Sequence, residues 1–479
     1  MSMLLIMVVV LSASAQGEKK EKSKKTFYFT VDEMPNLLRC LPGPPDTIGA
    51  DFYYDVMRYM WGKEQRLDKT RADIARKDAA WTHMDLISQF CEPLGLELSK
   101  TETPEIWKLL EVSLWTTDQM RVAPKAYYKR KRPFVRFHEH ILTNGQEEDE
   151  EVLGSEGSYP SGHTARGWTA AMILSELCPD RSNALLARGF AYGESRVIVG
   201  AHWQSDVDAS RLAASIGYCR LQTSPAYREQ MKKAREEFAQ KTGVRMKPSV
   251  ADGIERKGAD YYFTRRELPD LVRFLPAPPD TNGIQFGHDI MRYMWGKTMR
   301  HDEKRAEIAY RDATYGVDYI MREFSEPFGL EISKDGTPEI YKLLMDGTST
   351  CDSICYYPKR YYMRRRPFMR FQEPSLKPED EPALSKNGAY PSGHTILGWG
   401  AALLLSEVNP DRIDTLMARG YMYGESRVIV GAHWQSDVDC GRLAASAAFV
   451  RLHTSERFLE QMRKAQKEFA RLKNKRQKS

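Results

Sequence analysis

The sequence predicts an all-α protein made of two similar helical-bundle domains in tandem. The first observation is an internal repeat, because residues 195–208 and 426–439 both read SRVIVGAHWQSDVD. The second is a helical pattern in which apolar residues between Tyr227 and Phe238 are spaced by four, three and four positions. The end of the second copy repeats this spacing. Alternating patterns that predict strands are not evident, so bundles of helices are favoured.

The repeat divides a chain that is too long for one hydrophobic core. The 479 residues give two halves of about 220 residues each, which is enough for a separate core in each half. His202 and His433 differ by 231 positions, whereas Lys125 and Lys359 differ by 234. The second copy therefore lacks three residues. We place the loss in the acidic segment 147–151, which we expect to be an exposed loop.

A linker composition marks the boundary between the two copies. Residues 242–257 contain two glycines and a proline among charged residues, a composition that ends a helix. We therefore expect the first domain at 26–243 and the second at 259–479. Two similar domains in one chain are also candidates for an intramolecular pseudo-dimer.

The N-terminus has the pattern of a secretory signal peptide. Nine apolar residues, 3–11, precede the motif SASA at 12–15, which has the small-x-small form of a signal peptidase site. We expect residues 1–15 to be removed by cleavage after Ala15 and the mature protein to be exported. No later apolar run in the sequence reaches the roughly 18 residues of a transmembrane helix, so stable membrane insertion is not expected.

Charge and cysteine content exclude some functions. The net charge of +6 is small for this length, and much of it lies in the tails 19–25 and 473–478. Because no basic helix is interleaved with stacking aromatic residues, nucleic acid is not an expected partner. The seven cysteines have no equivalents between the copies, so there is no shared disulfide framework. Cys351 and Cys355 are close enough in sequence to form a bridge or to remain as thiols.

Three short elements recur in the same order in both copies. The first places Lys125 seven residues before Arg132, which precedes a proline, and Lys359 and Arg366 repeat the pattern. Seven residues are two helical turns, so we expect both cations on one face of a helix that ends before the proline. Alone, such a pair is most often a solvated face.

The second element is GSYPSGHT at 157–164, repeated with one change at 388–395. An apolar run follows it, so we expect Ser161, Gly162 and His163 at the start of a buried helix. Free amides and the helix dipole favour an oxyanion at such a position. A lone Ser-Gly-His is also consistent with a simple helix cap.

The third element places Arg196 six residues before His202, and Asp206 four residues after it. Helical spacing brings Asp206 within reach of the His202 ring, which fixes the tautomer and leaves the other nitrogen with a lone pair. A buried His-Asp pair is also common as a purely structural feature. The simultaneous presence of three cations, two histidines and a helix start, all duplicated, favours a functional site.

Together the elements K-x6-R-P, P-S-G-H and S-R-x5-H-x3-D resemble the signature of the type 2 phosphatidic acid phosphatase and vanadium haloperoxidase superfamily, and both copies match it in full. Within it, GSYPSGHT and the closing HWQSDV look like the class A non-specific bacterial acid phosphatases. The resemblance implies a compact all-α fold, a periplasmic location and hydrolysis of small phosphomonoesters without a metal or other cofactor.

The resemblance also implies a role for each matched residue. His202 would be the nucleophile that forms a phosphohistidine, Asp206 would orient it, and His163 would protonate the leaving alcohol. The residues that would bind the phosphate in the first copy are Lys125, Arg132, Ser161, Gly162 and Arg196. In the second copy the catalytic residues would be His433, Asp437 and His394, and the phosphate-binding residues would be Lys359, Arg366, Ser392, Gly393 and Arg427.

Other interpretations use the same residues. A vanadate-dependent haloperoxidase would hold vanadate where phosphate binds, but the short interval between the first two elements resembles compact phosphatases. A metal site of His163, His202 and Asp206 is disfavoured because the three cations already supply positive charge. A catalytically silent phosphate-binding protein is disfavoured because neither copy has lost its nucleophile or its acid. A membrane lipid phosphatase is disfavoured because the sequence has no apolar run of transmembrane length.

Overall fold

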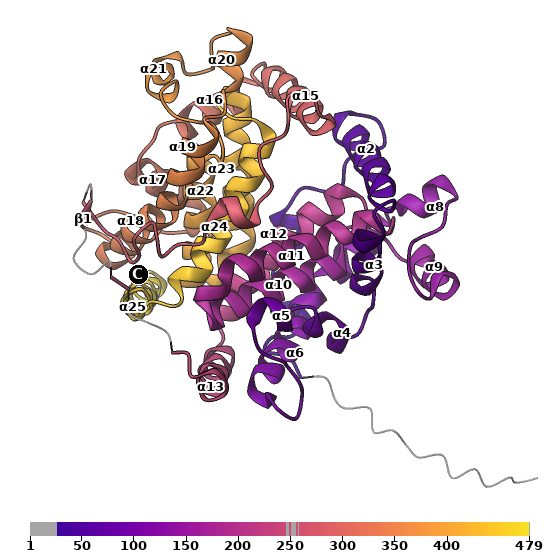
Figure 1. Cartoon of the computed structure of the whole chain (residues 1–479). Helices are drawn as coiled ribbons and strands as arrows, with labels where there is room; N and C mark the ends of the chain where they lie inside the picture. Colours follow the sequence, from indigo (N-terminus) through magenta and orange to yellow (C-terminus); the bar gives the residue numbers. More distant parts are fainter. Residues whose placement is uncertain (1–25, 246–248, 251–254, 257, 479) are drawn as a thin grey trace, which may run out of the picture.

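The computed structural model describes residues 26–245, 249–250, 255–256 and 258–478. The predicted signal peptide, residues 1–15, lies outside the described residues. Within them, the regular structure is helical apart from a two-stranded antiparallel ribbon of β1 (Glu255–Arg256) and β2 (Ala259–Asp260). The all-α prediction is confirmed, and the two repeats occupy opposite sides of the molecule (Figure 1).

The principal helices follow the same order in both repeats. The helices of the first repeat are η1 (Val31–Glu33), α1 (Leu37–Cys40), α2 (Ala50–Gln65), α3 (Lys69–Asp78), α4 (His83–Ser88), α5 (Cys91–Leu94), α6 (Pro104–Asp118), η2 (Gln119–Arg121), α7 (Val122–Tyr128), α8 (Pro133–Phe137), α9 (Gln146–Ser155), α10 (Gly162–Leu177), η3 (Pro179–Arg181), α11 (Ser182–Ile198), α12 (Gln204–Gln222) and α13 (Pro225–Thr242). Those of the second repeat are α14 (Leu271–Phe274), α15 (Ile284–Met299), α16 (Glu303–Asp312), α17 (Val317–Phe328), α18 (Pro338–Asp352), η4 (Ser353–Cys355), α19 (Tyr356–Tyr362), α20 (Pro367–Phe371), η5 (Pro378–Asp380), α21 (Glu381–Leu384), α22 (Gly393–Val408), η6 (Pro410–Arg412), α23 (Ile413–Val430), α24 (Gln435–Leu452) and α25 (Glu456–Lys478). However, α17 of the second repeat spans the equivalents of α4 and α5, and η5 with α21 replaces α9.

Each repeat is arranged around one buried helix, α10 in the first and α22 in the second. α10 packs against α6, α11 and α12, and α22 packs against α18, α23 and α24. Both helices are buried on nearly all sides, as expected for an apolar run without a polar face. A methyl group at Gly189 would lie 2.6 Å from Ala171 Cβ, and one at Gly420 would lie 2.7 Å from Ala402 Cβ. Glycine therefore permits the close approach of the central helix to its neighbour.

The helix predicted at the end of the first repeat is confirmed as α13. The apolar stripe from Tyr227 to Phe238 is its buried face. The helix ends at Gly243, whose φ of 72° lies in the left-handed region that glycine adopts without steric cost.

The acidic segment 147–151 was expected to be a loop, and this expectation is wrong. The segment lies in α9, where three acidic residues occupy the first turn and interact favourably with the helix dipole. None of its side chains is buried. The Leu153 carbonyl of α9 accepts a hydrogen bond of 2.7 Å from Arg132 Nε, so this helix contacts a predicted site residue.

The two repeats contact each other through equivalent elements. α1 packs on α23 of the second repeat, and α14, the equivalent of α1, packs on α11 of the first. The Asn36 amide donates to Asp414 Oδ1 at 2.9 Å, and the Asp270 amide donates to Asn183 Oδ1 at 2.8 Å. α2 and α15, which are equivalent helices, lie side by side (Figure 1). The contacts are reciprocal, as in an isologous interface.

The apolar interiors of the repeats are continuous. One cluster of buried residues includes Trp168 from the first repeat and Leu403 from the second. Tyr218 packs edge-on against Phe449, with ring centroids 6.2 Å apart, and Cys219 Sγ donates to the Leu403 carbonyl at 3.3 Å. Apolar side chains of each repeat are thus removed from water by the other.

A cavity of about 360 Å³ lies between the repeats and is lined by residues from both. In its wall Tyr54 of α2 stacks on His288 of α15, with ring centroids 4.2 Å apart and an interplanar angle of 8°. The two residues occupy equivalent positions in the two copies. His288 Nε2 also lies 2.8 Å from Asp51 Oδ1.

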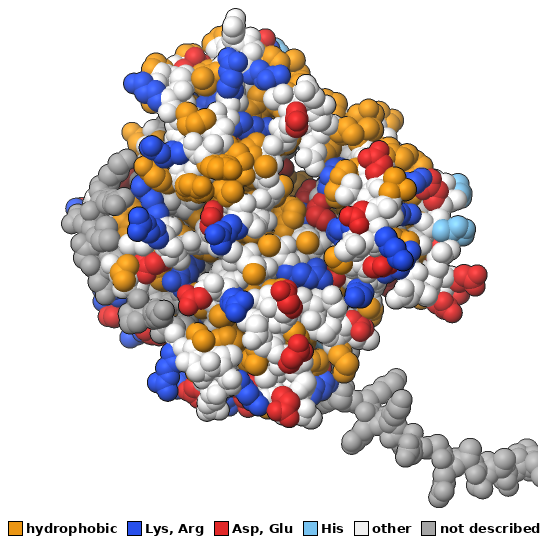
Figure 2. Space-filling model, in the orientation of Figure 1, with side chains coloured by type: hydrophobic (Ala, Val, Ile, Leu, Met, Phe, Trp, Pro, Cys, Tyr) orange, Lys and Arg blue, Asp and Glu red, His pale blue; other side chains and the backbone are white. Residues whose placement is uncertain are grey.

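The surface carries charges of both signs. Acidic and basic side chains are interspersed on the face shown in Figure 2. In the part of the chain that the structure describes, no helix combines the length and the apolar composition needed to cross a bilayer. All seven cysteines are buried thiols, so Cys351 and Cys355 are not bridged.

One buried ion pair distinguishes the cores of the two repeats. In the second repeat, His453 Nε2 lies 2.9 Å from Glu407 Oε2, and its Nδ1 lies 2.9 Å from the Phe449 carbonyl. Both partners are acceptors, so both ring nitrogens carry protons and His453 is cationic. In the first repeat, Gln222 occupies the equivalent position and donates to Glu176 at 2.8 Å. A neutral amide therefore replaces the imidazolium.

We expect His453→Gln to remove one pH-dependent contribution to stability. Burial alone would lower the pKa of His453, but the Glu407 carboxylate raises it above its ordinary value. The ion pair between His453 and Glu407 therefore contributes fully to the free energy of unfolding below the pKa of an unfolded histidine, about 6.5. This contribution is lost as the pH rises through the higher pKa of His453 in the folded protein. Thermal unfolding between about pH 5.5 and about pH 9 should show the wild-type chain losing stability relative to the variant as pH rises. If the difference in stability between the wild-type chain and the variant does not change with pH, His453 is not charged in the folded protein.

Candidate active site

The predicted residues of the first repeat converge on the loop between α11 and α12. His202 lies in this loop, two residues before α12 begins. Its Nδ1 is 3.3 Å from Asp206 Oδ2, and its Nε2 is 2.9 Å from Arg132 Nη1. Asp206 also accepts the Trp203 amide at 2.9 Å, so this carboxylate caps α12 as well as holding the ring. The sequence predicted this contact from the spacing of residues on one helix. In the structure His202 lies before α12, and Asp206 reaches its ring as the carboxylate that caps the start of that helix.

The electrostatics keep His202 neutral and Asp206 charged. Burial and the neighbouring Arg132 guanidinium lower the pKa of His202 well below its ordinary value. Burial alone would raise the pKa of Asp206, but the Arg130 guanidinium lowers it below its ordinary value. The Asp206 carboxylate therefore accepts from Nδ1–H, and Nε2 keeps its lone pair. This is the protonation state of a nitrogen nucleophile.

The side chains of Lys125 and Arg132 converge, but the prediction that both lie on one helix is wrong. α7 ends at Tyr128, Lys129 adopts a left-handed φ of 46°, and Arg132 is the N-cap of α8. The residue before a proline avoids the helical conformation, which explains the extended backbone of Arg132. Lys125 Nζ and Arg132 Nη2 both donate to the Gly157 carbonyl. Burial and the nearby Arg132 lower the pKa of Lys125 to about 7.

Ser161, Gly162 and His163 are at the start of α10, as predicted. Ser161 is the N-cap, and its Oγ accepts from the Thr164 amide at 3.3 Å. Gly162 is the first helical residue, so its amide is not used within the helix. The Ser161 amide donates to the Asp206 carbonyl at 3.2 Å, which fixes the start of α10 beside the start of α12.

His163 lies under an aromatic side chain. Its Nε2 is 3.0 Å from the Ala79 carbonyl, and its ring is 4.6 Å from that of Trp81. Since a carbonyl only accepts, Nε2 carries a proton and Nδ1 is the nitrogen left to exchange one. Burial, followed by the Arg196 and Arg166 guanidinium groups, lowers the pKa of His163 well below its ordinary value.

Arg196 is the most informative residue of the site. It is 1% exposed, and its Nε and Nη1 have no hydrogen-bond partner among the described residues. Its equivalent Arg427 is fully buried, and its Nε, Nη1 and Nη2 likewise have none there. Buried guanidinium donors without partners are costly. The same unpartnered guanidinium donors therefore recur at the equivalent position of both repeats.

The second repeat reproduces this arrangement. His433 Nδ1 is 3.4 Å from Asp437 Oδ2, and its Nε2 is 2.9 Å from Arg366 Nη1. Lys359 Nζ donates to the Gly388 carbonyl at 3.0 Å, and burial lowers the pKa of Lys359 to about 8. The remaining predicted residues also match their counterparts: Ser392 caps α22, Gly393 begins it, and His394 Nε2 is 2.9 Å from the Ala313 carbonyl.

A buried ionic bridge that was not predicted from the sequence lies behind His202 and behind His433. Arg130 contacts Asp206 Oδ1 and Asp55 Oδ2, each at 2.6 Å, and Asp55 Oδ1 accepts the Ser205 amide at 2.8 Å. Arg364, Asp437 and Asp289 form the same bridge in the second repeat, with Arg364 Nη2 2.6 Å from Asp289 Oδ2. Both arginines and both distal aspartates recur 234 positions apart, so comparison of the repeats would have identified them.

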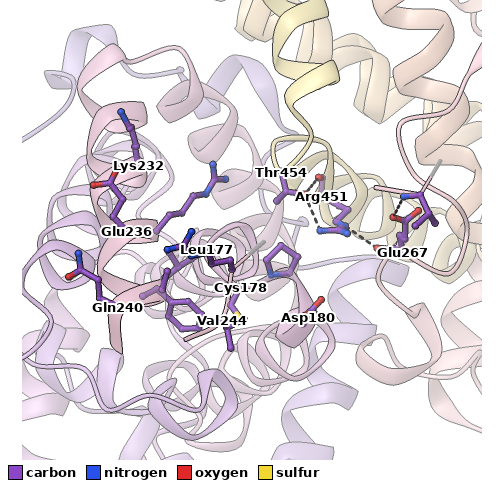
Figure 3. A pocket seen from close by; sticks show the side chains of 16 residues that line it. Leu177, Cys178, Asp180, Lys232, Glu236, Gln240, Val244, Glu267, Arg451 and Thr454 are labelled. Atoms are coloured by element: carbon purple, nitrogen blue, oxygen red, sulfur yellow. Dashed lines mark hydrogen bonds between the residues drawn. The ribbon is translucent and has the colours of Figure 1, made fainter. Parts of the chain in front are cut away.

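A separate cavity of about 670 Å³ lies beside α13. Lys232, Glu236 and Gln240 of α13 form one side of it, and Arg451, whose Nε donates to the Glu267 carbonyl at 2.9 Å, lies on the other (Figure 3). The described residues that line it include none of the predicted site residues.

Comparison with known proteins agrees with the geometry. The PAP2 superfamily matches residues 107–224 and 345–458. Non-specific acid phosphatase from Providencia stuartii is 43% identical over 214 residues, which are 44% of this chain and 86% of that protein. The Salmonella typhimurium non-specific acid phosphatase is 40% identical over 41% of this chain and 78% of its own length. For the acid phosphatase of Zymomonas mobilis the identity is 35%, over 47% of this chain and 83% of that protein.

Each relative thus matches about half of this chain and most of its own length, as expected for a tandem duplication. The chain belongs to the PAP2 superfamily and, within it, to the non-specific acid phosphatases.

We expect Arg130→Met to destabilise the protein. The change leaves the buried Asp55 and Asp206 carboxylates without their shared cation, and loss of one partner from a buried ion pair costs about 3–5 kcal/mol. The thermal unfolding midpoint should fall, and adding Asp55→Asn should recover part of the loss because one uncompensated charge is removed. Lys131→Met, at an exposed neighbouring position, is the control and should have little effect. Equal midpoints for the two single variants contradict a structural role of the bridge.

Proposed function

We propose that each repeat of this acid phosphatase contains its own active site, and that each site hydrolyses phosphomonoesters through a phosphohistidine intermediate. The observation that carries the proposal is the pair of buried arginines, Arg196 and Arg427, whose donors lack partners among the described residues beside a neutral histidine. A phosphoryl group offers several oxygen acceptors to such donors. His202 and His433 each have an Nε2 lone pair, which lies 2.9 Å from Nη1 of Arg132 and of Arg366, respectively.

In the first step, the lone pair of His202 Nε2 attacks phosphorus and forms an N–P bond. The bond from phosphorus to the ester oxygen breaks, and the leaving oxygen takes its electron pair and receives the proton of His163 Nδ1. In the second step, a water oxygen attacks phosphorus and gives a proton to His163. The N–P bond breaks and its electron pair returns to Nε2. The products are an alcohol and phosphate, and both histidines are restored.

The cations stabilise the charge of the transition state. Arg132 Nη1 is 2.9 Å from Nε2, close enough to contact an equatorial oxygen of a phosphoryl group bonded there. Lys125 and Arg196, with the Ser161 hydroxyl and the Gly162 amide, complete the set. These groups supply the positive charge, so the proposal requires no metal or other cofactor.

We place the domains at 26–243 and 259–479, packed as an intramolecular pseudo-dimer, which the reciprocal contacts of α1 and α14 support. The sequence of residues 1–15 supports export to the periplasm with cleavage after Ala15. Small phosphomonoesters are the expected substrates.

The proposal is tested by removing the nucleophiles one at a time, with EDTA present throughout. His202→Ala and His433→Ala should each leave substantial hydrolysis of phenyl phosphate, because the other site is intact. The double variant should lose its activity. It should also lose the covalent labelling of the chain that is expected when the reaction is quenched without acid. Activity that disappears in EDTA and returns with a metal ion contradicts the cationic mechanism. If either single variant is as inactive as the double variant, the sites are not independent.

The same protein also tests the alternatives. Halide oxidation with vanadate and peroxide, in the absence of hydrolysis, would favour a haloperoxidase. Phosphate binding with neither activity would favour a silent binding protein.

We expect His163→Ala, made in the His433→Ala background, to slow hydrolysis of alkyl phosphates by roughly 10²- to 10⁴-fold. Nitrophenyl phosphate should be affected much less, because its leaving group needs little protonation. Burial lowers the pKa of His163, so the acid form is present at low pH and is lost as pH rises through that value. The rate for alkyl phosphates should therefore decline toward alkaline pH. Equal losses on both substrates contradict the acid role.

A further inference from the structure

The central helices α10 and α22 differ in one charged residue. Arg166 of α10 corresponds to Leu397 of α22. Arg166 follows His163 by three positions, so both side chains lie on the same side of α10. All of the predicted catalytic and phosphate-binding residues are identical between the copies. A buried cation therefore accompanies the proposed acid of the first repeat and is absent beside that of the second.

Arg166 holds the aromatic side chain that packs on His163. Its Nη1 donates to the Trp81 carbonyl at 3.2 Å, and its guanidinium carbon lies 3.4 Å from the centroid of the Trp81 ring. The same ring lies 4.6 Å from the ring of His163. These two distances bring the guanidinium within about 8 Å of the His163 ring.

The charge of Arg166 is neither screened by water nor paired with a carboxylate. The residue is 1% exposed, and its Nε and Nη2 have no hydrogen-bond partner in the part of the chain that the structure describes. Burial lowers the pKa of Arg166, but a guanidinium stays protonated in a protein. Because a buried charge acts in a medium of low dielectric constant, Arg166 influences His163 more strongly than an exposed cation would.

Arg166 is one of several positive groups around His163. Arg196 of α11 and the His202 ring also face it. Burial, followed by the Arg196 and Arg166 guanidinium groups, lowers the pKa of His163 well below its ordinary value. A protonated His163 is therefore opposed by two guanidinium groups.

His394 in the second repeat has one guanidinium fewer among these neighbours. Burial, followed by Arg427 and the His433 ring, lowers its pKa, and Arg366 acts in the same direction. Leu397 carries no charge. A bound phosphoryl group offers negative charge to Arg196 and to Arg427 alike, so it offsets these two cations equally and leaves Arg166 as the difference.

An aspartate is present beside both sites and does not account for this difference. Asp118 and Asp352 occupy equivalent positions. Asp118 pairs with Arg121 at 2.8 Å. Asp352 accepts from Tyr315 Oη at 2.7 Å and lies beside Lys359 at the start of α22. Each carboxylate thus has partners of its own.

We propose that Arg166 is a positioning residue that makes His163 lose its proton at a lower pH than His394, so that the two active sites work over different pH ranges. The first site then stops hydrolysing alkyl phosphates at a lower pH than the second. The inference rests on the proposed function, because it requires His163 and His394 to protonate the leaving group.

The test measures kcat/KM for ethyl phosphate as a function of pH in single-site proteins. The alkaline decline in His433→Ala, which reports on the first site, should have its midpoint roughly one pH unit below that in His202→Ala. In the His433→Ala background, Arg166→Leu copies the second repeat and should raise the midpoint by roughly one unit. Arg166→Met is a second neutral variant, and Arg166→Lys keeps the cation and should keep the midpoint low.

Two control variants show whether the effect belongs to Arg166. Arg228→Leu, at an exposed arginine of α13, should not move the midpoint. Arg121→Cys also copies the second repeat, but the Arg121 side chain is 20% exposed and paired with Asp118, so the shift should be small. An equal shift from Arg121→Cys would contradict the assignment to Arg166.

Nitrophenyl phosphate separates an electrostatic role from a structural one. Its leaving group needs little protonation, so Arg166→Leu should leave its pH profile unchanged. A loss on both substrates at every pH, without a shift of the midpoint, would overturn the inference. Equal midpoints in the two active single-site proteins would also overturn it and would leave the proposed function standing.

Titration of the histidine rings by NMR tests the inference without turnover. The full chain has 10 histidines, and the signals of interest are assigned by their loss in His163→Ala and in His394→Ala. His163 should titrate at the lower pH, and Arg166→Leu should raise its midpoint without moving that of His394. Equal midpoints would overturn the inference. If the midpoints differ as expected but one single-site protein is inactive, the independence of the two sites fails and the role of Arg166 stands.

Discussion

A buried bridge of one arginine and two aspartates holds each set of predicted site residues in place, and in the first repeat it is formed by Asp55, Arg130 and Asp206. Its members come from α2, from the segment between α7 and α8, and from the start of α12. Two carboxylates buried this deeply require the shared cation. The Asp206 carboxylate also contacts the His202 ring and the Trp203 amide, and the Asp206 carbonyl accepts from the Ser161 amide. His202, the start of α10 and the outer helix α2 are thereby held in one arrangement.

The same bridge explains how His202 can keep a fixed orientation although it lies in a loop. A histidine on a flexible connection would lose orientation, but here the loop is short and its ends are fixed by α11 and by a carboxylate cap. The Trp203 indole also donates to the Lys131 carbonyl at 2.8 Å, next to Arg130 and Arg132. The cations and the histidine they serve are therefore positioned by the same local framework. Rigid support of this kind reduces the reorganisation needed during a reaction.

The sequence predicted the helical class, the duplication and the start of α10, because periodic apolar residues and an exact repeat report directly on local structure. It did not predict the path between Lys125 and Arg132. Spacing alone suggests one helix, whereas the left-handed Lys129 and the following proline break it. It also did not predict Arg130, since an arginine between two basic neighbours looks like a solvated charge until its buried partners are known. The reciprocal packing of α1 and α14 depends on tertiary contacts that no local pattern encodes.

The stacked pair of Tyr54 and His288 shows what a fused chain permits. In a dimer of identical subunits, a residue that faces its own equivalent across the two-fold axis has to be compatible with a copy of itself. Joining the repeats removes this requirement, because each member of the pair is encoded separately. Here one position is a tyrosine and the other a histidine whose ring reaches Asp51 at 2.8 Å, although residue 285, the equivalent of Asp51, is a glutamine. Covalent linkage also makes the association of the repeats independent of protein concentration. The centre of the molecule is therefore free to become asymmetric while the predicted site residues stay identical in both repeats.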